Sequence, residues 1–367
     1  MVCFSFACYF CRSSYTLASL LVLILLRPLG SLLGSLMILR EWLYAHGWLR
    51  RKTFDLPVIA IGNLSVGGTG KTPTTDWLVQ YLEHTQRLST VILSRGYGRR
   101  TRGFRWVQAD DTPAQVGDEP LMLKCRAPQR RVAVCASRVR GVENILRDAP
   151  STRVVVLDDA YQHLPLHAGR YLLLTSWKEP FFRDHPLPAG RLREPRRARH
   201  RANALLVTHT PEGVSEDDLQ DFAQSCAMPA HVPVFFSRMG YREWRDMTGE
   251  LTETPRGEKM LLVSGIARPR RMKAMLESLL QSDIELMPFR DHYNFRPEDL
   301  RRAAEYAQKK AVSRIITTEK DFMRLRQLSA LSQWAPFQPV YPVMDLKLLP
   351  AYQETFQNWL TSYVAPN

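Results

Sequence analysis

The chain has 367 residues, of which 45% are hydrophobic and 23% are charged, and its formal net charge at pH 7 is +14. This length is enough for about two domains, each able to bury its own core. The positive charge predicts an anionic partner: nucleic acid, an anionic membrane surface or a phosphorylated substrate. The spacing of the six cysteines suggests neither a zinc site nor a disulfide framework.

The N-terminal segment is apolar over residues 17–39, apart from an interruption at Arg27 and Pro28. A helix that crosses a bilayer needs about 20 apolar residues, and this segment reaches that length only if Arg27 and Pro28 are tolerated within it. The alternatives are two helices that meet at Pro28, with the second in the membrane interface, or an over-long gene start. A signal peptide is disfavoured because no small-residue cleavage site follows. We assign residues 1–45 as a membrane anchor, and the basic residues 50–52 predict that the bulk of the chain faces the cytoplasm.

The most specific pattern begins with an apolar strand expected from residue 58. The turn that follows it, residues 62–72, is rich in glycine and ends in Gly-Lys-Thr, as a P-loop does. Backbone N–H groups of a P-loop wrap phosphate oxygens, its lysine reaches the β- and γ-phosphates, and its threonine holds Mg²⁺. The strict pattern has glycine where this chain has Ser65, but the strand before the turn and the helical period after it support a P-loop. The residues predicted to contact the nucleotide are Gly67, Gly68, Thr69, Gly70, Lys71 and Thr72.

A second strand, expected at residues 91–94, leads into a basic glycine-rich loop that begins with Arg95. Guanidinium groups on such a loop suit contact with phosphate, although a solvated basic loop would have the same sequence.

Further along the chain, Asp118 and Glu119 stand just before Pro120, close to an expected helix start. They are able to cap that helix, or to supply a base and a metal ligand, and spacing alone does not decide between these roles.

A further apolar strand, expected at residues 154–157, ends in the paired carboxylates of Asp158 and Asp159. Because ligands sit beyond the carboxyl ends of parallel strands, an acidic residue here is able to bind the Mg²⁺ of a nucleotide. The alternative is that both aspartates are solvated residues of a turn.

After a strand at 171–174 comes the basic segment 188–201, which lacks the interleaved aromatic residues of a nucleic-acid-binding surface. This segment therefore predicts contact with phosphate or anionic lipid, with a solvated helix face as the alternative.

The rest of the chain predicts a second unit of strands and helices after a last strand of the first unit at 205–208. The elements expected in this unit are a strand at 261–267, a helix at 272–280, a helix at 297–310 and a strand at 314–318. The predicted fold class is α/β: a P-loop NTPase-like α/β/α domain at 46–240, with an N-terminal membrane helix. A linker at 241–258 joins it to a second, smaller α/β domain at 259–367 that closes the cleft.

Taken together, these segments resemble one family, the tetraacyldisaccharide 4'-kinases, which are the lipid A 4'-kinases of Gram-negative bacteria. The matching motifs occur in the family's order and lie between about residue 26 and about residue 325. They are the turn 62–73, Ser94-Arg95-Gly96-Tyr97, Gly117-Asp118-Glu119-Pro120, Leu157-Asp158-Asp159 with Gln162-His163, Gly190-Arg191-Leu192-Arg193-Glu194-Pro195, Asp291-His292-Tyr293 and Thr317-Thr318-Glu319-Lys320-Asp321. The serine at residue 65 belongs to the family pattern, whereas Ala160-Tyr161 stands where the family usually has Gly-Phe.

The resemblance implies ATP-dependent phosphorylation of the 4'-hydroxyl of tetraacyldisaccharide 1-phosphate, which forms lipid IVA in lipid A biosynthesis. It implies ATP and Mg²⁺ as cofactors and a location at the cytoplasmic face of the inner membrane. The expected partners are the anionic acylated disaccharide 1-phosphate and inner-membrane lipid, with no nucleic acid and no obligate protein partner.

The resemblance also implies roles for single residues. Asp118 is the expected base for the sugar hydroxyl, helped by His292 from the second domain, and Lys71 is the third expected catalytic residue. The residues expected to hold Mg²⁺ are Thr72, Asp159 and Glu119. The residues expected to contact the substrate are Arg95, Arg193 and Asn63. The role of residues 317–321 stays open.

Two other classes of protein remain as alternatives. One is a membrane-attached nucleotide switch related to the partitioning ATPases, but those proteins carry a signature lysine where this chain has Val66. The other is a basic nucleic-acid-binding ATPase, which the apolar N-terminus and the absence of interleaved aromatic residues disfavour.

Overall fold

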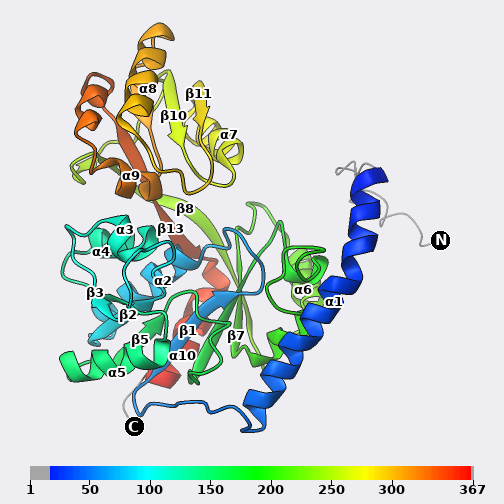
Figure 1. Cartoon of the computed structure of the whole chain (residues 1–367). Helices are drawn as coiled ribbons and strands as arrows, with labels where there is room; N and C mark the ends of the chain where they lie inside the picture. The colour runs from blue at the N-terminus through cyan, green and yellow to red at the C-terminus, as the bar shows by residue number, and fades with distance from the viewer. Residues whose placement is uncertain (1–16, 365–367) are drawn as a thin grey trace.

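The structure is a computed structural model that describes residues 17–364. Figure 1 shows a larger and a smaller lobe, with the long N-terminal helix, in blue, along one side of the larger lobe. One sheet of 13 strands runs through both lobes in the order β11-β10-β12-β13-β8-β7-β6-β1-β5-β2-β4-β3, with β9 paired to β8. Residues 1–16, which hold Cys3, Cys8, Cys11 and the start of the expected anchor, lie outside the described residues.

The strands of this sheet and the helices around it have the following residue ranges. The strands are β1 (Val58–Asn63), β2 (Thr90–Ser94), β3 (Arg105–Trp106), β4 (Arg131–Val134), β5 (Val154–Leu157), β6 (Arg170–Ser176), β7 (Ala204–Thr208), β8 (Val234–Asp246), β9 (Leu251–Thr252), β10 (Met260–Ser264), β11 (Ile284–Pro288), β12 (Arg314–Ile316) and β13 (Val340–Leu348). The α-helices are α1 (Leu17–Ala45), α2 (Lys71–Gln80), α3 (Pro113–Val116), α4 (Asp118–Arg126), α5 (Arg138–Asp148), α6 (Glu216–Ser225), α7 (Pro269–Leu280), α8 (Pro297–Lys309), α9 (Glu319–Leu325) and α10 (Pro350–Val364). A π-helical turn continues α2 at Tyr81–Thr85, and 3₁₀ segments lie at Phe181–Arg183, Arg196–Arg201 and Ser329–Phe337.

The core of the larger lobe forms around strands that the sequence marks as continuous apolar runs. β1, β2, β5 and β7 are buried at every position, as expected of parallel strands with helices on both faces. Apolar side chains of α2, α4 and α10 pack on one face of this sheet, and those of α5 and α6 pack on the other. The prediction of an α/β fold is confirmed, and the sheet is mixed because β3 pairs antiparallel with β4 and β13 pairs antiparallel with β8.

Two long strands connect the lobes. β8 pairs in parallel with β7 near its start and antiparallel with β13 over the rest of its length. Of the range 241–258, expected as a linker, residues 241–246 belong to β8 and residues 251–252 form β9. β13 returns the chain to the larger lobe, where α10 packs beside β1 (Figure 1). We therefore propose a division in which α10 belongs with the larger lobe and the smaller lobe ends within β13.

The N-terminal apolar segment is one helix, α1, with Pro28 inside it, rather than two helices that meet at this proline. Across residues 17–364, the structure has no helix with both the length and the apolar character needed to cross a membrane. α1 packs closely on the larger lobe, since a Cβ on Gly30 would lie 3.1 Å from the carbonyl oxygen of Pro186. Farther along the helix, Glu41 pairs with Arg201 at 3.0 Å.

Candidate active site

The glycine-rich loop connects β1 to α2 at the carboxyl edge of the sheet. Gly70 caps α2 in the left-handed region (φ 79°), which favours glycine, and a Cβ there would also press on the end of the Met239 side chain. Added Cβ atoms on Gly67 and Gly68 would meet no described atom within 4 Å, which leaves the backbone at these two positions open to a ligand. The N-terminus of α2 supplies further free N–H groups and a positive dipole end, both suited to phosphate.

A second loop holds the glycine-rich loop in place. Ser65 pairs with Leu192 in an antiparallel bridge, and the Val66 N–H donates to the carbonyl of Arg191 at 2.8 Å. Within residues 17–364, the buried Thr69 Oγ1 has no hydrogen-bond partner. A buried hydroxyl without a partner is costly, so this atom is suited to contact with a phosphate oxygen. The loop therefore fits the phosphates of a nucleotide.

Four residues expected to act at the site lie together beside this loop. Lys71 Nζ donates to Asn63 Oδ1 at 3.3 Å and lies 3.8 Å from Asp159 Oδ1. Arg193 pairs with the same carboxylate at 3.2 Å. Burial by itself raises the pKa of Asp159, but the charges of Lys71 and Arg193 outweigh burial and hold this pKa below its ordinary value. Asp159 is thus an ionised carboxylate beside the lysine of the loop.

The two aspartates that follow β5 have different surroundings. Asp158 points into the protein and accepts hydrogen bonds from Thr75 at 3.1 Å and Ser94 at 3.4 Å. Burial raises the pKa of Asp158, and the nearby charges of Glu119 and Asp159 raise it further. The raised pKa makes Asp158 readily protonated, while Asp159 pairs with Lys71 and Arg193, and Glu119 pairs with Lys320.

The expected Mg²⁺ would need oxygen ligands at this edge of the sheet. Among residues 17–364, no three His, Cys, Asp or Glu side chains lie close enough to form a metal site by themselves. Mg²⁺ in phosphoryl-transfer sites usually has one or two carboxylate ligands, with phosphate oxygens and water completing its shell. The hydroxyl and carboxylate oxygens of Thr72, Asp159 and Glu119 are the ligand type that Mg²⁺ prefers, so the residues present fit such an ion.

The expected base lies where the two lobes meet. Asp118 is the first residue of α4 and is buried, and its carboxylate contacts Arg324 and His292 Nδ1, the latter at 3.2 Å. Burial by itself raises the pKa of Asp118, but the hydrogen bond from His292 and the charges of Arg324 and Lys320 lower it to about 2. Asp118 and His292, predicted to act together, are therefore in contact although they belong to different lobes.

The sequence left open the role of residues 317–321; in the structure Thr318 caps α9, and residues 319–321 form its first turn. Lys320 lies 3.2 Å from Glu119, and Arg324, one helical turn farther, contacts Asp118. Sequence reasoning missed Arg324. The i, i+4 spacing of Lys320 and Arg324 was a signal, because it places two cations on one face of a short helix.

Arg95 lies apart from these ion pairs. Its side chain is exposed, on the loop after β2. Burial, together with the positive charges of Arg138, Arg40 and Arg95, lowers the pKa of His163 to about 4. Arg95 therefore lies near the segment that follows Asp159.

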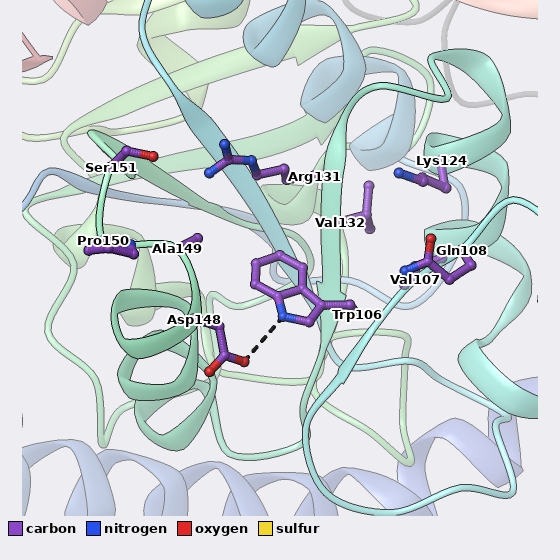
Figure 2. Close-up of a pocket in the computed structure, with 10 residues that line it drawn as sticks. All are labelled: Trp106, Val107, Gln108, Lys124, Arg131, Val132, Asp148, Ala149, Pro150 and Ser151. Atoms are coloured by element: carbon purple, nitrogen blue, oxygen red, sulfur yellow. Dashed lines mark hydrogen bonds between the residues drawn. The ribbon is translucent and has the colours of Figure 1, made fainter.

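A separate groove of about 370 Å³ lies between β3, β4 and α5 (Figure 2). In it, the indole N–H of Trp106 donates to Asp148 at 3.2 Å. Arg131, which begins β4, and Ser151, which precedes β5, also line the groove. It therefore lies at the amino ends of the parallel strands, opposite the edge that holds Lys71, and ligands of such sheets bind at the carboxyl ends.

The chain matches one family of known proteins over most of its length. The model of the family described as "Tetraacyldisaccharide-1-P 4'-kinase" matches residues 22–365. The chain belongs to this family. A tetraacyldisaccharide 4'-kinase of Cytophaga hutchinsonii is 37% identical over 316 residues, which cover 85% of this chain and 89% of that protein. One of Flavobacterium johnsoniae is 38% identical over 316 residues, which cover 84% and 89%.

A solved structure of the same family is also similar. It is the crystal structure of the "apo" form of LpxK from Aquifex aeolicus in complex with ATP at 2.2 Å resolution. The TM-score is 0.75 at 26% identity, and the match covers 94% of this chain and 99% of that chain. The resemblance of the sequence to the tetraacyldisaccharide 4'-kinases is thereby confirmed.

Proposed function

We propose that this protein transfers the γ-phosphoryl group of ATP to the 4'-hydroxyl of a tetraacyldisaccharide 1-phosphate and so forms lipid IVA. The family of the chain supports this function. The structural observation that carries it is the meeting of two sets of residues at one edge of the sheet: Lys71 with Asp159, and the Asp118–His292 pair. Glu119, next to Asp118, is close enough to Asp158 for its charge to raise the pKa of that aspartate. The alternatives of a nucleotide switch and a nucleic-acid-binding ATPase lack this support.

The glycine-rich loop acts in this proposal as a P-loop. Its backbone N–H groups and the N-terminus of α2 bind phosphate oxygens, and Lys71 holds the β- and γ-phosphates. The contacts of Lys71 with Asn63 and Asp159 beside the loop support this role. Arg193 and Arg95 steady the phosphate groups of the substrates, since guanidinium groups pair well with phosphate.

Thr72 and Asp159, with Glu119 as a further ligand, would hold Mg²⁺ in this proposal. When bound, the ion would supply positive charge that neutralises the charge developing on the phosphates during transfer. Asp118 accepts the proton of the sugar hydroxyl. The transition state of phosphoryl transfer is loose, so this proton is lost late, and a weakly basic carboxylate is sufficient. Because Asp118 and His292 lie on different lobes, closure of the lobes assembles the site.

A direct test of the function follows γ-labelled phosphate from ATP to the tetraacyldisaccharide 1-phosphate in detergent. The wild-type protein is expected to label the lipid, and Lys71→Ala is expected to lower the rate about 10²–10³-fold, because a preorganised positive charge is lost. Lys309→Ala, an exposed lysine at the end of α8, is the control and should match the wild type. A wild-type protein that binds ATP but never labels the lipid would refute the function.

We further propose that α1 lies in the interface of the inner membrane, on its cytoplasmic side. One stripe of α1 exposes large apolar side chains to solvent while the opposite stripe packs on the larger lobe. The exposed residues on or just after the helix are Leu29, Leu32, Leu33, Leu36, Met37, Leu39, Trp42, Trp48 and Leu49. Arginine residues at 40, 50 and 51 accompany them and suit anionic headgroups. This orientation would bring the active site to the level of a lipid headgroup.

Replacing two leucines of this stripe should weaken membrane binding. Leu32 and Leu36 are 59% and 54% exposed, so serine at both positions costs the folded protein little packing. We expect the double variant to bind vesicles of phosphatidylethanolamine and phosphatidylglycerol about tenfold more weakly, as judged by flotation, because less apolar surface enters the interface. Leu251→Ser with Leu279→Ser, two exposed leucines of the smaller lobe, is the matched control. Equal flotation of both variants would argue against an interfacial α1.

A further inference from the structure

The imidazole of His292 lies between a carboxylate and two cations. Its Nδ1 is 3.2 Å from Asp118 Oδ2 and 3.1 Å from Arg324 Nη2, and its Nε2 is 3.2 Å from Lys320 Nζ. The backbone fixes the ring in this position: His292 has φ 58°, and its N–H donates to the carbonyl of Gly265 at 3.1 Å. Two arrangements of the ring proton compete in this environment.

Hydrogen-bond chemistry distinguishes these arrangements. The ammonium group of Lys320 only donates hydrogen bonds, so its contact with Nε2 is favourable only when Nε2 has no proton. The ring proton is then on Nδ1, from which it is donated to Asp118. In the other tautomer, Nε2–H faces the ammonium donor at 3.2 Å, while Nδ1 accepts from Arg324 and Asp118 loses its bond from the ring. Lys320 therefore favours the first tautomer and disfavours the second.

Lys320 is itself held in place from both sides. Its Nζ pairs with Glu119 Oε1 at 3.2 Å, and its side chain is 21% exposed. The preceding residue, Glu319, receives two hydrogen bonds from the buried Arg126 at the far end of α4. The start of α9 is therefore fixed against α4, and the ammonium group does not sample solvent freely.

We propose that Lys320 is a positioning residue, which fixes His292 as the Nδ1–H tautomer and thereby directs this ring to hold Asp118. This inference rests on the proposed function. In the transfer step, the sugar oxygen bonds to the γ-phosphorus, and the bond from that phosphorus to the β–γ bridging oxygen breaks. The electron pair of the broken bond leaves with ADP, and the hydroxyl proton goes to Asp118. The ring keeps its proton throughout and orients the carboxylate that receives the new one.

The tautomer is measured directly by long-range ¹H–¹⁵N NMR of the ¹⁵N-labelled full-length protein in detergent, with His292→Gln to assign the signal. We expect the Nδ1–H tautomer of His292 in the wild type. In Lys320→Met we expect the Nε2–H tautomer, because the aliphatic part of the side chain remains but the ammonium donor is gone. Lys320→Arg should keep Nδ1–H, because a guanidinium also only donates.

In the phosphoryl-transfer assay, Lys320→Met should lower kcat about 10–100-fold, as loss of an orienting partner does, and leave KM for ATP unchanged. Lys273→Met, which breaks a surface pair with Glu277, is the control and should change neither the tautomer nor kcat.

Two results would overturn the proposal. One is an unchanged His292 tautomer in Lys320→Met. The other is a rise in KM for ATP without a fall in kcat, which would make Lys320 a phosphate contact instead. The NMR comparison needs no turnover, so it decides the role of Lys320 even if the wild-type protein fails to phosphorylate the lipid and the proposed function falls.

Discussion

Asparagine in place of Asp118 is expected to lower kcat by about 10²–10⁴-fold, the usual contribution of a general base. Asparagine has nearly the same shape and keeps an oxygen that can accept from Arg324, but it cannot accept the hydroxyl proton. Affinity for ATP should stay close to that of the wild type, because Asp118 contacts His292 and Arg324 rather than the glycine-rich loop. Single-turnover transfer of labelled phosphate measures the first effect, and equilibrium binding of ATP measures the second.

The matched control for this variant is Asp110→Asn, an exposed aspartate on the same lobe. It removes the same charge from the protein without touching the interface between the lobes, and its kcat should equal that of the wild type. Turnover close to that of the wild type in Asp118→Asn would remove Asp118 from the role of base. A large loss of ATP affinity would instead indicate that this carboxylate acts mainly in assembling the nucleotide site.

The largest expected effect on stability comes from Arg126, which is the centre of a buried ionic cluster. Its guanidinium donates to Asp76 of α2 at 2.7 Å and to both carboxylate oxygens of Glu319 of α9. Arg130 pairs with the other oxygen of Asp76 at 2.6 Å. Burial by itself raises the pKa of Asp76, but these two arginines outweigh it and keep this pKa below its ordinary value. The cluster connects the helix after the glycine-rich loop, the helix of Asp118 and the smaller lobe.

Arg126→Met should lower the free energy of unfolding by about 3–5 kcal/mol, because Glu319 and part of Asp76 would stay buried without a partner. Denaturant unfolding followed by tryptophan fluorescence measures this change. The matched control is Arg301→Met, which breaks an exposed pair with Glu298 and should cost less than about 1 kcal/mol. The triple variant Asp76→Asn, Arg126→Met, Glu319→Gln should recover part of the loss, since fewer unpaired charges remain. Equal stability of Arg126→Met and the wild type would show that water enters the cluster.

Local patterns were enough to predict most elements of the site. The apolar runs that became β2, β5, β6 and β7 end within about two residues of their expected bounds, because each strand is buried and must be apolar throughout. Asn63, Lys71 and Asp159 follow directly from strands whose carboxyl ends meet at one edge, so their proximity was predictable from sequence. The contact of Asp118 with His292 came only from the resemblance, since the two are far apart in the chain.

Other features depended on long-range pairing that no local pattern records. The return of β13 along β8 gives one sheet through both lobes and places α10 on the larger lobe, although the sequence suggested a linker and a terminal domain. The strand pattern alone did not separate two neighbouring aspartates, of which the resemblance chose Asp159. In the structure Asp158 turns toward Thr75 and Ser94, while Asp159 faces Lys71. Which of two adjacent carboxylates is buried depends on side chains supplied by other elements.

The sequence by itself determined the family, the nucleotide loop and the type of residue at each motif, because these depend on short stretches with fixed spacing. Only the tertiary structure decided how the charges are paired. Arg324 and Lys320 reach Asp118 and Glu119 across more than 200 positions of the chain. An ion pair depends on distance in space, and that distance is set by the packing of α9 on α4 rather than by any property of the two segments alone.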